Sequence, residues 1–197
     1  INKKYISKDI EDILIKLKKH NIKTSFSMMV AFPPTPFIDY NTTIRFIMKL
    51  YMINKSLDIT LNFYLPALEN EYHFEALKLG FYLPNTYTGY EEKIKTGFDL
   101  TWVTNKMKQE VFYLGNFYIP IIKFERPVNT DRRLFALWNV IFILFYPIVL
   151  FRFIFKVYTY TWDAKLAFKF IRTFEKKYGI KDSNLNNFMI GIKRTEK

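Results

Sequence analysis

Asn62 and Tyr64 are the polar side chains best placed for chemistry, because they lie in an alternating apolar run over residues 59–65. Such alternation is typical of a strand with one buried face. An amide buried there needs a hydrogen-bond partner, and a ligand or a barrel interior would supply one. Exposure on an edge strand is the alternative. These side chains therefore indicate a binding site for a polar ligand.

Other reactive residue types are scarce. The chain of 197 residues has no cysteine, which excludes a disulfide, a thiolate zinc site, a thiol nucleophile and a cysteine-ligated cluster held by this chain. The two histidines, His20 and His73, lie in different segments without a second ligand at metal-binding spacing. No phosphate-binding glycine loop or nucleophile elbow is present, so the sequence leaves any catalytic residue unknown, and we predict no metal site.

The elements that would position the polar residues alternate between helix and strand. Apolar spacing predicts helices over 7–20, 41–53, 71–79 and 102–114, strands over 24–32 and 59–65, and a polar loop over 82–100. This order predicts a parallel α/β fold, either an open doubly wound sheet or part of a barrel. Such folds bind ligands at the carboxyl ends of their strands. The nominated positions are Met29, Val30 and Ala31 at the first strand end, and Asn62, Tyr64 and Pro66 at the second.

Beyond Pro127 the chain becomes an aromatic and cationic tail. Residues 134–151 carry no charge, a length close to that of a membrane span. We expect Pro147 to divide this run into two helical pieces, and Asp163 to cap a last helix that ends at Gly179. Three placements stay open for the tail. They are burial against the rest of the protein or a partner subunit, a span, and an interfacial helix whose Arg152 and Lys156 reach the phosphates of an anionic membrane.

The formal net charge of +12 predicts attraction to polyanions, which include nucleic acid, anionic lipid and phosphorylated ligands. Aromatic residues make up 19% of the chain and would stack on bases in a nucleic-acid module. The sequence has no RNA-binding aromatic motif, however, and its apolar tail does not fit a solvated groove. Nucleic acid is therefore the least favoured partner. An AT-rich genome would also enrich Lys, Asn, Ile, Phe and Tyr without any partner.

Two segments resemble radical S-adenosylmethionine enzymes. The run DIEDILIKLKKHNIKTSFSMMVAFPPTPFIDYNTTIRFIMKL resembles the region around the fifth barrel strand, where the family has a Gly-x-Pro-Gly-Glu-Thr-like loop and this chain has residues 31–35. The run LDITLNFYLPALENEYHFEALKLGF is similar to the sixth strand, its Pro-x-Pro-Gly-Thr turn and a helix ending in Leu-Gly-Phe. The helix start at Trp102 and the aromatic, basic tail are similar to the C-terminal region of the cobalamin-binding branch of this family. That branch includes anaerobic magnesium-protoporphyrin ester cyclase-like proteins.

The resemblance implies a fold and a function. Residues 1–125 would be the C-terminal half of a (β/α) radical S-adenosylmethionine barrel, and residues 126–197 a mainly helical, aromatic-rich C-terminal region. The whole protein would be a cytoplasmic oxidoreductase or transferase, or one peripheral to the membrane, that acts on a small-molecule or lipid-like substrate. Its cofactors would be S-adenosylmethionine, a [4Fe-4S] cluster and cobalamin. The cluster cysteines would belong to an upstream half of the same protein, because the sequence begins at Ile1 without Met.

The cofactor pocket that the resemblance implies includes a short set of residues of this chain. They are Met29, Val30, Ala31, Pro33, Asn62, Tyr64 and Pro66. Ala31 and Pro34 stand where the family has glycine, and glycine lets the backbone approach a ligand closely. This departure favours an alternative function, in which the chain is a non-catalytic binding or membrane-peripheral scaffold module with degenerate cofactor loops.

Overall fold

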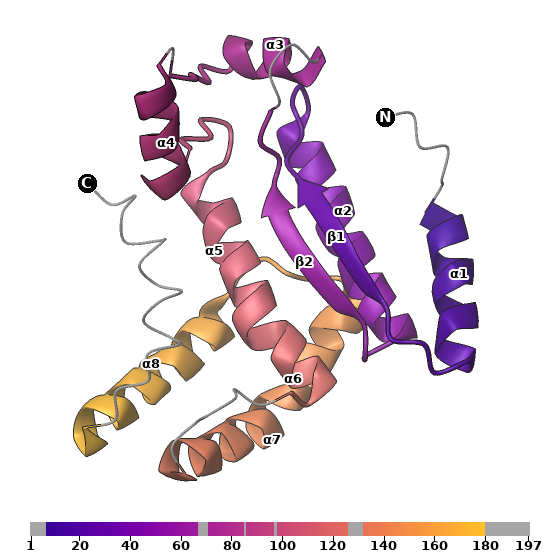
Figure 1. Cartoon of the computed structure of the whole chain (residues 1–197). Helices are drawn as coiled ribbons and strands as arrows, with labels where there is room; N and C mark the ends of the chain where they lie inside the picture. The colour runs from indigo at the N-terminus through magenta and orange to yellow at the C-terminus, as the bar shows by residue number, and fades with distance from the viewer. Residues whose placement is uncertain (1–6, 67–70, 85, 97, 126–131, 180–197) are drawn as a thin grey trace. The chain divides into compact units, whose positions relative to one another are not determined.

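The computed structural model describes residues 7–66, 71–84, 86–96, 98–125 and 132–179, and this part of the chain is rich in helix (Figure 1). The chain forms two compact units whose segments alternate along the sequence. The first unit comprises residues 1–24, 45–57 and 105–197, and the second comprises residues 25–44 and 58–104. The predicted division at residues 125 and 126 follows sequence composition and stays a prediction.

The second unit is built on a parallel pair of strands. β1 (Ser25–Val30) pairs with β2 (Asp58–Phe63) in a register that sets Ser25 opposite Asp58 and Val30 opposite Phe63. Alternation gives the sheet two different faces. Along β1, Val30 is buried and Phe26 and Met28 are half-buried, whereas Ser25, Ser27 and Met29 are exposed. Both strands were predicted, and their carboxyl ends lie at the same edge of the sheet.

The predicted barrel is wrong. The described residues contain a single two-stranded sheet, and every described element after β2 is helical. A barrel requires about eight strands that close on themselves, and the described part of the chain has two. The prediction failed because it took one strand–helix–strand unit as the C-terminal half of a barrel.

Three helices complete the second unit. They are the first part of α2 (Pro36–Ile53), which connects the strands, then α3 (Glu71–Lys78) and α4 (Tyr87–Thr96). α3 ends as predicted, since Gly80 has φ 84° and the amide of Phe81 donates to the carbonyl of Ala76 at 3.0 Å. α4 lies inside the segment predicted to be a loop, so that prediction is wrong.

The described secondary-structure elements of the first unit are all helical. The unit contains α1 (Ser7–Lys19), α5 (Asn105–Tyr113), a π-helical turn (Leu114–Tyr118), α6 (Ile119–Lys123), α7 (Arg132–Phe155) and α8 (Trp162–Tyr178). α1 was predicted almost to the residue. Its Glu11 pairs with Lys49 at 2.6 Å, and Lys18 donates to the carbonyl of Ile53 at 2.6 Å. These contacts tie α1 to the second half of α2.

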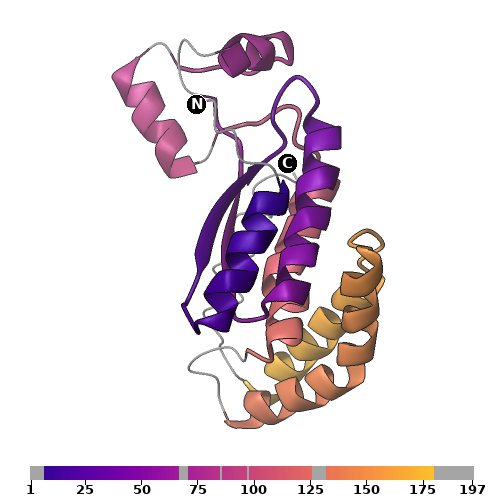
Figure 2. The same ribbon diagram turned by 90° about the vertical axis from the view of Figure 1, so that its right-hand side faces the viewer.

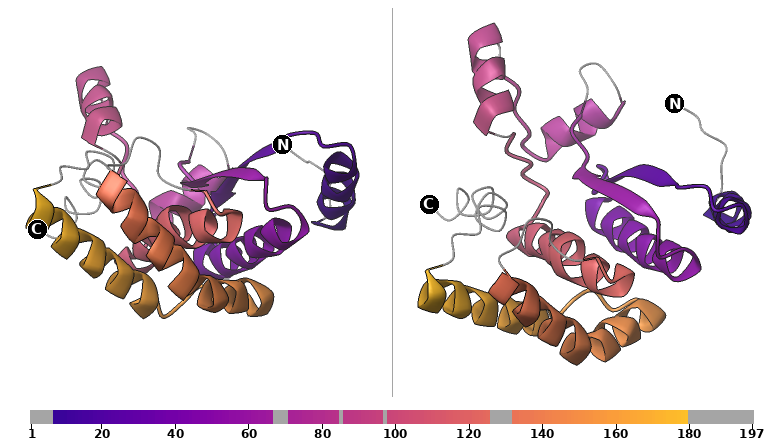
Figure 3. Two further views of the ribbon diagram at one scale, coloured as in Figure 1. Left: turned by 90° about the horizontal axis from the view of Figure 1, so that it is seen from below. Right: turned by 60° about the horizontal axis from the view of Figure 1, so that its bottom comes forward.

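α7 and α8 form a helical hairpin (Figures 2 and 3). The two helices are antiparallel, because Arg152 near the end of α7 binds Asp163 near the start of α8, while Arg133 lies 5.6 Å from the ring centroid of Tyr178. α7 is long and apolar enough to cross a membrane. Pro147 lies inside this helix, which continues from Arg132 to Phe155, and the predicted kink that divides it into two pieces stays a prediction.

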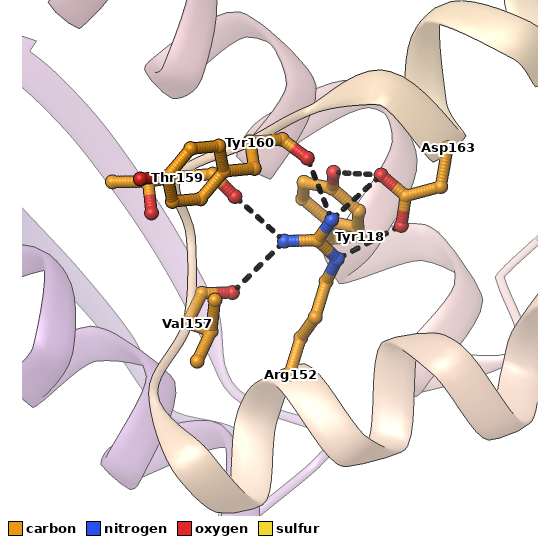
Figure 4. A network of polar contacts seen from close by, with 6 residues as sticks. All are labelled: Tyr118, Arg152, Val157, Thr159, Tyr160 and Asp163. Atoms are coloured by element: carbon orange, nitrogen blue, oxygen red, sulfur yellow. Dashed lines mark hydrogen bonds and ion pairs between the residues drawn. The ribbon is translucent and has the colours of Figure 1, made fainter.

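Arg152 connects the end of α7 to the turn and to the start of α8 through hydrogen bonds (Figure 4). Its guanidinium donates to the two carboxylate oxygens of Asp163 at 2.8 and 2.9 Å, and to the carbonyl of Thr159 at 2.8 Å. The hydroxyl of Tyr118 donates to the same carboxylate at 2.8 Å. Burial, and then the adjacent Asp163 carboxylate, raise the pKa of Tyr118, so this phenol stays a donor.

Two predictions about these charged residues are wrong. Asp163 was expected to cap α8, but Thr161 occupies the N-cap position and Asp163 is fully buried. In the interfacial placement, one of three left open, Arg152 was expected to reach lipid phosphates, but its donors are used by Asp163 and the carbonyls of the turn. The predicted end of α8 is confirmed, since Gly179 has φ 64°.

Candidate functional site

The candidate site is the carboxyl edge of the sheet in the second unit. Met29 and Asn62 are partners in the strand register, and both side chains are exposed, that of Met29 by 51%. An amide offers both a donor and an acceptor, and a thioether offers an adaptable apolar contact. Side by side, the two can bind a small ligand that has both polar and apolar groups.

The loop after β1 has an unusual backbone. Ala31 is fully buried and has φ 64°, a left-handed conformation that costs a residue with a Cβ about 1–2 kcal/mol. The carbonyl of Ala31 accepts a 2.8 Å hydrogen bond from the indole nitrogen of Trp102. This bond joins the loop to a segment 71 residues further along the chain and stabilises the turn.

Asp39, in the first turn of α2, holds the loop from its other side. Its carboxylate accepts a 3.2 Å hydrogen bond from the amide of Phe32, and the amide of Ala31 also donates to it. Burial raises the pKa of Asp39, and the two backbone donors offset only part of that effect. The loop is therefore fixed by a carboxylate that pays a desolvation cost.

Three aromatic rings pack beside this edge. The rings of Phe32 and Tyr64 are 4.2 Å apart, and Tyr72 meets them edge-on at 5.6 and 5.7 Å. The amide of Tyr64 donates to the carbonyl of Val30 at 2.9 Å, which carries the strand pairing one residue beyond β2. The cluster fixes the two strand ends relative to each other.

The seven predicted site residues divide into two groups. Met29 and Asn62 are exposed, whereas the other five are buried and support the edge, namely Val30, Ala31, Pro33, Tyr64 and Pro66. Sequence reasoning missed Asp39 and Tyr72 as supports, and it used Trp102 only as a helix start. An acidic residue in the first turn after a proline-rich loop was a signal for Asp39. No local sequence pattern indicates that Trp102 contacts Ala31.

An open groove of about 450 Å³ lies in the first unit, along α7. It is lined by Phe124, Asn139, Phe142, Ile143, Tyr146 and Pro147. The rings of Phe124 and Tyr146 are 4.6 Å apart, and Lys55 donates to the Tyr146 hydroxyl at 3.0 Å. The lining is mostly apolar, so this groove suits an apolar group rather than a catalytic reaction.

Within the described ranges, no three side chains among His, Asp and Glu gather as metal ligands. Comparison of the chain with protein-family models, with curated proteins and with solved structures gives no match.

Proposed function

We propose that this chain is the C-terminal part of a radical S-adenosylmethionine oxidoreductase or transferase of the cobalamin-binding type. In this proposal the carboxyl edge of β1 and β2 contacts S-adenosylmethionine or the substrate. The proposal rests on the order of the two sequence segments and does not require this chain to form a barrel. The structural observation that supports it, in addition to that order, is the left-handed backbone of Ala31.

Ala31 stands where the resembling family has glycine. Glycine is favoured where φ is positive, because it has no Cβ. Ala31 has φ 64° there, and Trp102 and Asp39 hold the turn in place. The sequence thus departs from the family at a position whose backbone keeps the conformation that a glycine would favour. This weakens the main argument for a degenerate loop.

Of the three proposed cofactors, S-adenosylmethionine is the one that residues of this chain can contact at the strand edge. The amide of Asn62 can donate to and accept from polar groups of S-adenosylmethionine, and Met29 offers an apolar contact beside it. In enzymes of this type the cofactor and its reduced cluster supply a 5′-deoxyadenosyl radical. Without cysteine, this chain offers no thiolate to a cluster, so cluster ligands would belong to residues outside this sequence.

The proposed location is cytoplasmic and peripheral to a membrane. It is supported by α7, which has no charged residue between Arg133 and Arg152, and by the net charge of +12. The substrate class that fits this location is a small molecule or a lipid-like molecule.

Equilibrium binding of S-adenosylmethionine to the full-length, cluster-loaded protein tests the proposal. Asn62→Ala removes one polar partner at the edge, and we expect it to weaken binding about threefold to tenfold. Ser25→Ala is the matched control, because Ser25 lies at the opposite end of the same exposed sheet face. Its affinity should equal that of the wild type.

Two results would overturn this function. One is absence of S-adenosylmethionine binding and cleavage by the loaded wild type, which would leave the scaffold alternative. The other is a gene whose upstream sequence encodes no Cys-x3-Cys-x2-Cys run.

A further inference from the structure

α7 is apolar on its outward face as well as on its inward face. Seven large apolar side chains are exposed along it: Phe135 near its start, and six that we call the apolar stripe, namely Val140, Ile143, Leu144, Phe151, Ile154 and Phe155. Ile143 is 76% exposed and Leu144 is 64% exposed. The residues of the apolar stripe lie three, four or seven residues apart or in adjacent pairs, so they share one side of the helix. A surface helix normally presents charged residues on that side.

The apolar stripe is bordered by cations. Arg132 begins α7, Lys156 follows it, and both are exposed. On α8, the exposed Lys165 and Lys169 lie on the same helix as the exposed Trp162 and Phe170. The sequence has no Asp or Glu from residue 132 to residue 162. The hairpin from residue 132 to residue 179 has nine Lys and Arg residues against two acidic residues, Asp163 and Glu175, so this surface combines exposed apolar side chains with an excess of positive charge.

We propose that the α7–α8 hairpin docks on an anionic lipid surface, with the apolar stripe in the headgroup–acyl boundary and the bordering lysines and arginine on lipid phosphates. This inference rests on the peripheral location proposed above and names its partner and its contact residues. The apolar stripe and the cations both favour membrane binding, because buried apolar area and positive charge each increase the affinity of a protein for anionic membranes.

The opposite side of α7 explains why the helix lies on the membrane and does not cross it. Leu134, Trp138 and Val149 are buried in the first unit. Arg152 on that side is bound to Asp163, which is fully buried. A span would have to detach these side chains and carry the ion pair into hydrocarbon. Docking leaves the inner packing intact.

Flotation of the full-length protein with vesicles tests the inference. We compare vesicles of phosphatidylglycerol and phosphatidylcholine with vesicles of phosphatidylcholine alone. The wild type should float with the anionic vesicles and be released by moderate salt. Ile143→Glu should lower partitioning at least tenfold, because it buries a charge in the boundary. Lys165→Gln with Lys169→Gln should lower it about 30-fold at low salt.

Phe37→Glu is the matched control for Ile143→Glu. Phe37 is 66% exposed in the second unit, and the substitution changes the net charge equally. Equal losses from both substitutions would overturn the inference, since net charge alone would then explain binding. The inference would also be overturned if the wild type did not float, or if only detergent released it from the vesicles. It would be overturned as well if the protein bound no lipid and formed a dimer that Ile143→Glu converts to a monomer. Circular dichroism verifies that each variant is folded. Binding of S-adenosylmethionine is a separate readout, so this inference and the proposed function can fail independently.

Discussion

Arg152 and Asp163 form a charged pair in the core of the first unit, with side chains exposed by only 7% and 0%. Removing one partner of such a pair leaves an uncompensated buried charge and costs about 3–5 kcal/mol. We therefore expect Arg152→Met to lower the free energy of unfolding by that amount, as measured by urea denaturation.

Arg132→Met is the control for Arg152→Met, because Arg132 is exposed on the same helix. Its effect should stay within about 0.5 kcal/mol. Equal losses in the two variants would contradict the role assigned to the pair. Arg152→Lys keeps the charge but loses the planar fork that reaches three carbonyls, so its stability should lie between those of Arg152→Met and the wild type.

Ala31 permits a second test at the scale of one residue. Ala31→Gly should change the free energy of unfolding by less than about 1 kcal/mol, since relief of the positive φ is offset by the greater chain entropy that glycine loses. Ala31→Val should cost more than about 2 kcal/mol, because a β-branched side chain fits neither the positive φ nor the buried site. Thermal or chemical unfolding measures both.

Ala76 provides the comparison for Ala31. It is fully buried in α3 of the same unit, with a right-handed helical backbone. Glycine in a helix costs about 1 kcal/mol, so Ala76→Gly should be clearly destabilising. If Ala31→Gly and Ala76→Gly cost the same, the left-handed backbone of Ala31 is not a source of strain.

At the scale of elements, Asp39 links the loop after β1 to the start of α2. Its pKa is raised by burial, so the native state binds its proton more tightly than the unfolded chain does. The stability contribution is therefore complete below the unfolded pKa, about 4, and falls as pH rises to the native pKa. Asp39→Asn removes this titration. We expect the stability of Asp39→Asn relative to wild type to increase with pH across that window, as measured by urea denaturation in a pH series.

Asp39→Ala separates the charge from the hydrogen bond. It leaves the amide of Phe32 without an acceptor, whereas the side-chain oxygen of Asp39→Asn can still accept, so Asp39→Ala should be about 1–2 kcal/mol less stable than Asp39→Asn at every pH. A wild type that gains stability relative to Asp39→Asn as pH rises would contradict the direction of the shift.

Local patterns predicted most of the elements near the candidate site. Alternation located β1 and β2, and capping residues located the ends of α1 and α3. α2 begins earlier than predicted, at Pro36, because proline is well suited to the first turn of a helix. α4 was missed because its Thr, Gly and Tyr residues have weak helix propensity. The strand ends were thus predictable, whereas the supports supplied by Asp39 and Trp102 depend on contacts between elements.

At the scale of the whole molecule, the sequence predicted a parallel strand pair and an apolar helical tail, but not the architecture that contains them. A strand–helix–strand unit occurs in open sheets, barrels and smaller folds alike, so its presence cannot select among them. The interleaving of the two units is set by contacts between residues far apart in the chain. The 71-residue separation of Ala31 and Trp102 is one such contact, and no local spacing encodes it.

The turn between α7 and α8 has a property that matters at a lipid boundary. Water normally hydrates the carbonyls of an exposed turn, and a carbonyl stripped of water without a new donor costs several kcal/mol. The carbonyls of Val157, Thr159 and Tyr160 already receive guanidinium hydrogen bonds from Arg152, at 3.3, 2.8 and 2.8 Å (Figure 4). Transfer of this turn toward lipid would leave those bonds in place. The Arg152 guanidinium thus takes the place of water at these three carbonyls. The turn can therefore lose its hydration shell and keep its conformation.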